Sequence, residues 1–471
     1  MLGLAILRLA TAALIPLTED EAYYRLWSQH LSLGYYDHPP MVAWWIRAGI
    51  MAAGDNALGV RLLPALASLL STLLVYDLGR MLGDRRTGLL AALLYNCTLT
   101  IGAAAALAVP DVPAGLFWTL ALWGLAKASK DDAPRWWLLA GAAAGLACLS
   151  KYSALFLAPG AVLWLAVTPQ GRKQMTRPWP WACALIAALV FSANVAWNAE
   201  HHWMTFAKQF GRATPGHWAP RYLLEFVAGQ FVLLNPLVAV LAGAGAVKAW
   251  RMRRGEPIAW LMLASLVPFL AYLTLHSLHD RVQAHWPVPL YSAAAVLAAW
   301  AVKDASGWRA ALARLAPIGL ALSVLALAHA ALPQTDLGPS DPALQLRGWP
   351  AFGRAVGAAR ANAGAAWTGA LSYGVSAQLQ AAQMDRAPIL QVDERDRYAD
   401  MPMANPPDFS RPGLIVDLLR RMDAKTLNAC FASVGPIVEI DRGPFKAADE
   451  RYGAALVSGP AHNLLAQGCG K

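Results

Sequence analysis

Long apolar segments are the feature of this sequence that most restricts its fold. A bilayer core of about 30 Å is crossed by roughly 17–25 residues of apolar α-helix. The first 333 residues contain eleven segments that reach or approach this length. They are residues 2–17, 58–78, 87–109, 113–129, 136–150, 153–168, 181–198, 222–247, 257–275, 287–302 and 311–333. The sequence therefore predicts an all-α polytopic membrane protein with about 11 transmembrane helices over residues 1–333.

The distribution of charge also separates residues 1–333 from residues 334–471. Only 14% of the 471 residues are charged, and the net charge is +10. Residues 334–471 contain 14 basic and 14 acidic residues, so the whole excess lies among the apolar segments. Basic residues in that position flank membrane helices, which argues against a nucleic-acid-binding surface. They concentrate in alternate loops, and by the positive-inside rule these loops and the N-terminus are cytoplasmic. An odd number of spans then leaves residues 334–471 outside.

The first external loop, residues 18–57, is too long for a simple turn. Residues 19–32 and 41–54 read as two helices within it. The second helix contains Trp44, Trp45 and Arg47, an aromatic and basic mixture typical of headgroup depth. We therefore expect interfacial helices in this loop.

The C-terminal region, residues 334–471, is long enough for one domain. It alternates strand-like runs (GLIVDL, PIVEID, GAALVSG) with helical ones (SAQLQAAQ, LLRRMDAKTL). This pattern predicts a small α/β domain outside the membrane. Cys430 and Cys469 lie in it, and a disulfide and two free thiols are equally open from sequence alone.

Acidic side chains gather in the outer loops. Asp20 and Glu21 follow the first span, and the alternative to catalysis there is a capping box between Thr18 and Glu21, with Glu19 as a solvated cap. Asp37 precedes His38 and two prolines that fix an extended turn; the alternative is an Asx-turn. A third site is Asp111, between two prolines, where a helix cap is the alternative.

Basic side chains lie on the same side of the membrane. Lys151 follows a span of small residues, and a snorkelling lysine is the alternative to a ligand-binding one. Two further loops supply His201 with Arg212, and Arg281 with His285. Histidines at such spacings can bind a metal, but adjacent His201 and His202 point in different directions on a helix. We therefore expect no metal and no cofactor.

Carboxylates beside cations suit transfer from an anionic leaving group. A carboxylate would deprotonate an acceptor hydroxyl, and lysine and arginine would stabilise a departing phosphate. A proton-coupled transporter can show the same residue types.

The segment LTEDEAYYRLWSQHLSLGYYDHPPMVAWWIR resembles the first external loop of bacterial glycosyltransferases related to protein O-mannosyltransferases. That group includes the lipid A aminoarabinose transferases, and its pattern is an Asp-Glu pair followed by a (His/Lys)-Pro-Pro turn. The segments AVPDVPAGLFWTLALWGLAKA, GLACLSKYSALFLAPG and VQAHWPVPLY resemble further elements. The resemblance covers about residues 5–300, and the C-terminal domain matches only in general layout.

The resemblance implies a GT-C fold and inverting transfer of a sugar from a polyprenyl-phosphate donor. By position, Asp20 resembles the catalytic base, with Glu21 beside it, and Asp111 resembles the second acid. Lys151 resembles a ligand of the donor phosphate. The other residues expected to bind donor phosphate or substrate are Arg281, His285, Asp37, His38, Tyr24, His201 and Arg212.

The sequence thus predicts an integral membrane glycosyltransferase of the bacterial inner membrane, with a periplasmic C-terminal domain. Its partners are expected to be the lipid-linked donor, membrane lipids, and an envelope glycan, lipid or protein acceptor, with no nucleic acid. The alternatives are a transporter or flippase for a lipid-linked sugar and a non-catalytic assembly subunit. Charges clustered at one face and the lack of an internal repeat favour the enzyme over the transporter.

Overall fold

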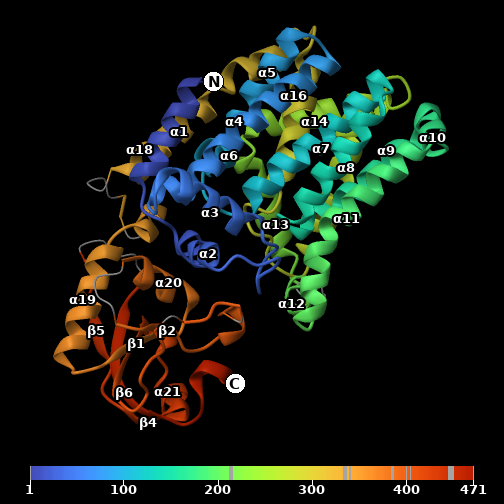
Figure 1. Cartoon of the computed structure of the whole chain (residues 1–471). Helices are drawn as coiled ribbons and strands as arrows, with labels where there is room; N and C mark the ends of the chain where they lie inside the picture. Colours follow the sequence, from blue (N-terminus) through green and yellow to red (C-terminus); the bar gives the residue numbers. More distant parts are fainter. Residues whose placement is uncertain are drawn as a thin grey trace. The chain divides into compact units, whose positions relative to one another are not determined.

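The computed structural model describes residues 2–104, 106–211, 216–332, 337–338, 341–382, 387–398, 400–403, 405–443 and 450–469. Internal contacts divide the chain into two compact units (Figure 1). The first unit consists of residues 1–12 and 33–328, and the second of residues 13–32 and 329–471. The second unit therefore includes the start of the first external loop, whereas the sequence alone predicts a division at 333/334, which stays a prediction.

The first unit is built from helices. Its elements are α1 (Leu2–Leu14, most of it), α3 (Met41–Ala53), α4 (Ala57–Leu82), α5 (Arg85–Asn96), α6 (Leu99–Ala104), α7 (Asp111–Asp131), α8 (Pro134–Cys148), η1 (Tyr152–Phe156), α9 (Leu157–Val167), α10 (Pro169–Met175), α11 (Pro178–Glu200), α12 (Met204–Gly211), α13 (Arg221–Leu233), α14 (Pro236–Arg251), α15 (Pro257–His276), η2 (Val288–Leu290), α16 (Tyr291–Val302), α17 (Trp308–Leu315) and α18 (Ile318–Ala331, most of it).

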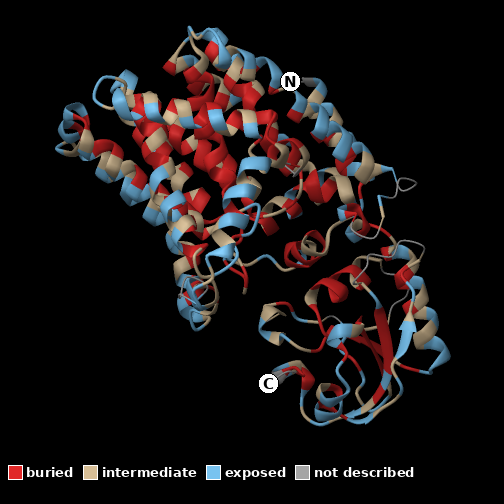
Figure 2. Ribbon diagram, turned by 180° about the vertical axis from the view of Figure 1, so that it is seen from behind, coloured by how far each residue is buried: buried red, intermediate tan, exposed pale blue. Residues whose placement is uncertain are grey.

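Helix α16 forms the centre of this unit. It packs against α4, α5, α14 and α15, and its residues 291–301 are all buried (Figure 2). Its small alanine side chains allow neighbouring helices to approach closely, as is usual in membrane bundles. At the periphery, α11 exposes Leu185 and Leu189. Apolar side chains that face outward along a long helix are the expected surface toward lipid.

Four helices of the described chain are long and apolar enough to cross a membrane, namely α4, α11, α15 and the continuous stretch Trp308–Ala331. The number rises to six if each of two bent pairs counts as one span. These pairs are Tyr152–Val167 with α10, bent by 117°, and α13 with α14, bent by 101°. The predicted count of about 11 spans is therefore not confirmed by length and composition, although every predicted segment falls on a helix or a pair of helices.

The second unit combines a sheet with short helices. Its elements are α2 (Glu19–Gln29), η3 (Pro342–Leu346), α19 (Trp349–Asn362), β1 (Trp367–Ala370), α20 (Tyr373–Ala382), β2 (Ile389–Gln391), η4 (Arg395–Tyr398), β3 (Gly413–Leu418), η5 (Leu419–Arg421), α21 (Ala424–Cys430), β4 (Phe431–Val434), β5 (Val438–Ile440), β6 (Tyr452–Pro460) and α22 (Leu464–Gln467).

The predicted C-terminal sheet is present, in the order β2-β1-β3-β6-β4 with β5 beside β6 (Figure 1). Strand β1 pairs in parallel with β2 and β3, whereas β6 is antiparallel to β3, β4 and β5. All six residues of β3 are buried because alternate side chains enter two different apolar cores: Leu414 and Val416 pack with α19 and α20, and Ile415 packs with Trp367 on the other face.

The strands predicted for the α/β domain are present, whereas one of its two predicted helical runs is broken. GLIVDL is β3, and the runs PIVEID and GAALVSG contain β5 and part of β6. SAQLQAAQ lies largely on α20, but LLRRMDAKTL is divided between η5 and the start of α21, with Asp423 as the N-cap that begins the second helix. A disulfide joins Cys430 and Cys469.

Candidate functional site

Asp111 is the centre of a charged cluster in the first unit. Its carboxylate accepts a hydrogen bond from Lys151 Nζ at 2.6 Å and lies 3.7 Å from His285 Nε2. The side chains of Asp111 and Lys151 are 5% and 12% exposed, so the pair is largely withdrawn from water. Sequence-distant candidates that were predicted separately therefore form one cluster.

Local structure explains how these residues are held. Asp111 is the first residue of α7, directly after the turn made by Pro110. Lys151 follows α8, and the N–H of Met41 donates to the carbonyl of Leu149 at 3.1 Å, which brings the His-Pro-Pro turn beside this segment. Burial alone would raise the pKa of Asp111, but the charges of Lys151, His285 and His38 outweigh it and hold that pKa below its ordinary value. Asp111 is therefore a carboxylate that organises cations.

The other predicted residues of this unit lie in separate contacts. Asp37 is buried and pairs with Lys208 at 2.6 Å. Arg281 is exposed and pairs with Glu225 at 2.8 Å. The ring of His201 stacks on Trp197 with a centroid separation of 4.0 Å. None of the contacts described for these three residues reaches Asp111, Lys151 or His285. The predicted residue Arg212 lies outside the described residues.

A small cavity of about 40 Å³ adjoins the Asp111 cluster. Asp111 and His285 line it together with Ser68, Ser71 and apolar residues of α6 and α7. The carboxylate and the imidazole of the cluster therefore face a small cavity with a mixed lining.

In the second unit, α2 begins with the capping box that the sequence offers as the alternative for Glu21. Thr18 N–H donates to Glu21 Oε2 at 3.0 Å, and Glu21 N–H donates to Thr18 Oγ1 at 3.1 Å. Glu21 is fully buried in this arrangement. The predicted binding residue Tyr24 is also buried, with its ring against Trp27 at 4.8 Å. Glu21 therefore has a clear structural task at the start of the helix.

Asp20 is half-buried and accepts a hydrogen bond from Tyr373 Oη at 2.9 Å. Its neighbour Glu19 is also half-buried, so the expectation of a solvated cap is wrong. Burial, together with the nearby negative charges of Glu450 and Asp20, raises the pKa of Glu19 to about 7. At the N-terminus of α2, the hydroxyl of Tyr373 therefore holds the carboxylate of Asp20. The neighbouring Glu19 ionises less readily than an ordinary glutamate.

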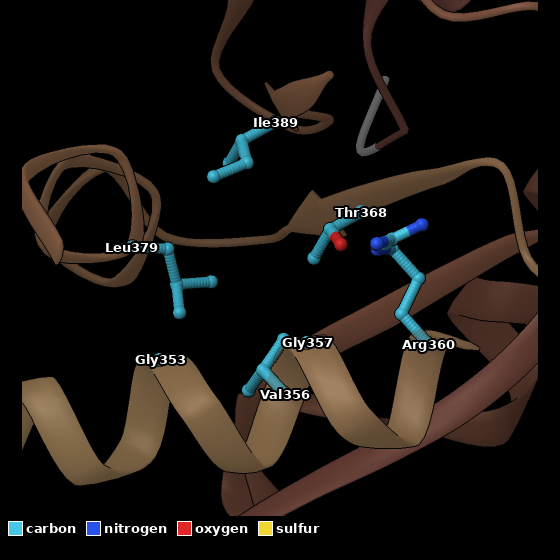
Figure 3. Close-up of a pocket in the computed structure, with 7 residues that line it drawn as sticks. All are labelled: Gly353, Val356, Gly357, Arg360, Thr368, Leu379 and Ile389. Carbon is cyan, nitrogen blue, oxygen red and sulfur yellow. The ribbon is translucent and has the colours of Figure 1, made fainter. Parts of the chain in front are cut away.

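Two further hollows lie in the second unit. One, of about 280 Å³, is lined by Gln29, Gln380, Gln391, Arg395 and other residues of α2, α20 and the β2 edge, so amide and guanidinium groups face it. A smaller hollow of about 20 Å³ lies between α19 and the sheet, where Figure 3 shows Arg360 beside Thr368. None of the seven described residues that line this smaller hollow is acidic, so it offers no candidate base.

Metal-ligating side chains do not cluster in the part of the chain that the structure describes: no group of three or more His, Cys, Asp or Glu residues is close enough to hold an ion. A reaction without a metal or cofactor stays a prediction.

Sequence reasoning missed Tyr373 and Asp417. Tyr373 is separated from Asp20 by 353 positions, and no local pattern connects the two. Asp417 is fully buried at the carboxyl end of β3, where it accepts hydrogen bonds from Ser372. The signal available for Asp417 is a single acid in an otherwise apolar strand run.

The fold has a counterpart among solved structures. In the crystal structure of ArnT from Cupriavidus metallidurans bound to undecaprenyl phosphate, the chain has a similar fold, with a TM-score of 0.68 over 97% of this chain and 98% of that one, at 14% sequence identity. This confirms the predicted GT-C fold class, with a small C-terminal sheet.

Sequence comparison finds relatives over part of the chain. Residues 37–197 match the profile described as dolichyl-phosphate-mannose-protein mannosyltransferase. The chain is 32% identical to lipid A galacturonosyltransferase RgtD of Rhizobium johnstonii, over 60% of this chain and 59% of that protein. It is 30% identical to undecaprenyl phosphate-alpha-4-amino-4-deoxy-L-arabinose arabinosyl transferase of Pseudomonas aeruginosa, over 52% of this chain and 46% of that protein.

These matches confirm the resemblance to the GT-C glycosyltransferase group that the first-loop motif indicates. The alignments span about half of the lengths of the two relatives. Together with the apolar helices, the homologues identify a multi-pass membrane protein.

Proposed function

We propose that this protein is an integral membrane glycosyltransferase that transfers a sugar from a polyprenyl-phosphate donor to a cell-envelope acceptor, with inversion. Lipid A is the acceptor that the name of the Rhizobium relative favours, and undecaprenyl phosphate is the carrier that the name of the Pseudomonas relative favours. The single structural observation that carries the proposal is the Asp111 cluster, because its buried carboxylate holds Lys151 and lies beside His285, and both Asp111 and His285 line a cavity.

In this proposal an acid accepts the proton of the acceptor, and basic residues stabilise the leaving phosphate. Asp20 takes the proton of an acceptor hydroxyl as the oxygen forms its bond to the anomeric carbon. The bond between that carbon and the phosphate oxygen breaks, and the electron pair leaves with the polyprenyl phosphate. Lys151 and His285 stabilise the negative charge of the phosphate, and Asp111 holds both cations in position.

The remaining predicted residues take supporting roles in this proposal. Arg281 and His38 add positive charge for the donor, and Glu21 fixes the start of α2 that carries Asp20. Asp37, Tyr24, His201 and Arg212 stay candidates for contact with substrate.

We also propose the orientation that the basic loops indicate. The N-terminus is cytoplasmic, the C-terminal domain is periplasmic, and the bacterial inner membrane is crossed about eleven times when the shorter apolar helices are included. The disulfide between Cys430 and Cys469 supports an oxidising compartment for that domain.

The test is reconstitution of the full chain in liposomes with undecaprenyl phosphate-linked 4-amino-4-deoxy-L-arabinose or galacturonic acid and lipid A. A covalent lipid A product detected by mass spectrometry is expected. Movement of the lipid-linked sugar across the bilayer without a product would instead support the transporter alternative. If the assay shows no product and no movement of the sugar, the non-catalytic assembly subunit becomes the better interpretation.

A further inference from the structure

Residues at the start of α20 contact the acidic end of α2. Helix α20 lies against α2 within the second unit (Figure 1). Ser372 is bound to Asp417, Tyr373 donates to Asp20, and Gly374 lies against the carboxylate of Glu19. One turn later, Gln378 Nε2 donates to the carbonyl of Leu17 at 2.8 Å.

The topology of the sheet explains why these residues meet. Strands β1 and β3 are parallel neighbours, and Ser372 and Asp417 lie at their carboxyl ends. Polar functional residues usually gather at this edge of parallel strands. Ser372 donates through its N–H at 2.6 Å and through Oγ at 2.9 Å to Asp417 Oδ2, so the backbone that carries Tyr373 is fixed to the sheet.

The ring of Tyr373 is fixed as well as its backbone. The guanidinium of Arg397 stacks over it at 4.4 Å from the centroid, and the ring of Tyr23 packs against it at 4.8 Å. A tyrosine held on both sides can present its hydroxyl in one direction with little loss of rotamer freedom on reaction.

We infer that Tyr373 is the positioning residue of the proposed base: its hydroxyl fixes the carboxylate of Asp20 in the orientation that receives the acceptor proton. This inference rests on the proposed function. A hydroxyl donor orients the carboxylate of Asp20, whereas the carboxylate of Asp111 accepts from the charged ammonium group of Lys151. The C-terminal unit then contributes directly to the proposed catalytic step.

The test compares Tyr373→Phe with Tyr23→Phe in the purified full-length protein. The first variant keeps the ring and its contacts with Arg397 and Tyr23 but removes the donor to Asp20. The second removes a hydroxyl from the same aromatic cluster. Transfer from undecaprenyl phosphate 4-amino-4-deoxy-L-arabinose to lipid A is followed across pH, with thermal unfolding as the check on folding.

For Tyr373→Phe we expect kcat to fall about tenfold, as for the loss of a hydrogen bond to a charged group, while KM for the donor stays constant. The acidic limb of the pH profile should move up by about one pH unit, because the Asp20 carboxylate loses a donor that stabilises its ionised form. Tyr23→Phe should follow the wild type. The other titratable groups around this end of α2 include Glu19, Glu21, Arg397, Tyr398, Asp417, Arg442 and Glu450, and they are present in both variants.

An unchanged kcat or an unmoved acidic limb in Tyr373→Phe would overturn the inference if Asp20→Asn is inactive in the same assay. Full transfer by Asp20→Asn, or none by the wild type, would instead overturn the proposed function. Should Tyr373→Phe not fold, Ser372→Ala provides the same test, since it loosens the turn that presents Tyr373. The same direction of shift is expected, and no shift would overturn the inference.

Discussion

Asp111 and Asp20 are the two acids with a role in the proposed reaction, one in each unit, and their surroundings differ in kind. Asp111 is deeply buried and paired with Lys151, with His285 and His38 near enough to stabilise its charge. Asp20 is half-buried, accepts a hydrogen bond from the neutral hydroxyl of Tyr373, and has the acid Glu19 beside it.

This difference separates the roles that two carboxylates can have. A carboxylate surrounded by cations holds its proton weakly and is a poor base, but it positions those cations well. The carboxylate of Asp20 instead accepts a hydrogen bond from a hydroxyl, which orients it. Sequence position alone marks both as outer-face acids, so it does not distinguish the proposed base from the acid that we propose to position the cations.

The largest effect on this contrast is expected from removing the cation. Lys151→Met leaves Asp111 buried without its strongest partner and removes a donor for the phosphate, so kcat/KM should fall by about 100-fold or more. The matched control is Lys127→Met, which removes another lysine near an aspartate, Asp77 at 3.6 Å. Transfer is measured at varied donor concentration.

A double variant sharpens the result. Lys151→Met with Asp111→Asn removes both charges, which should restore thermal stability because no uncompensated charge stays buried. Transfer should stay low if Lys151 acts on the donor. Recovery of both stability and transfer would show that the pair is only structural.

Gly374→Ala should have the next largest effect, and it acts on the other acid. A Cβ at this position would collide with the carboxylate of Glu19, so that side chain must move from its place beside α20. We expect a loss of about 1–3 kcal/mol of stability and a clear fall in transfer. Gly243→Ala is the control, because a Cβ there meets nothing within 4 Å. A variant that melts and transfers like the wild type would mean that the contact between α20 and α2 is loose.

The smallest effect concerns the pH dependence of stability. The folded protein raises the pKa of Glu19 from its ordinary 4.5 to about 7, so folding favours the protonated form. The stabilisation from this group is complete below pH 4.5 and is lost as the pH rises through about 7. Glu19→Gln cannot ionise, and should melt about 2–4 °C above the wild type at pH 8 but equally at about pH 4. Equal melting at both pH values would contradict a protonated Glu19.

How much of this architecture can be predicted from sequence depends on the range of the interactions. Capping of α2 by Thr18 and Glu21 and the strand GLIVDL follow from patterns within a few residues, and the structure contains both. The apolar run 222–247 shows the limit: the structure bends by 101° between α13 and α14, where Asn235 has a positive φ of 70° and Pro236 begins the next helix. The Asn-Pro pair is a local turn signal that hydropathy alone overlooks.

The candidate site shows the same division. Asp20, Asp111, Lys151 and His285 can be chosen from motifs, because acids and bases near membrane spans are rare and conspicuous. The hydrogen bond from Tyr373 to Asp20 cannot, since it depends on how β1, β3 and α20 pack around a loop more than 300 positions earlier in the chain.

The most direct test of the central claim, that Asp20 is the base of a glycosyl transfer, is the activity of Asp20→Asn with donor binding measured on the same preparation. The asparagine keeps the shape of the side chain and can still accept a hydrogen bond from Tyr373, but it cannot take up the acceptor proton. We predict that binding of undecaprenyl phosphate is unchanged while transfer to lipid A falls by about 1,000-fold or more. Transfer at the wild-type rate would contradict the role of Asp20.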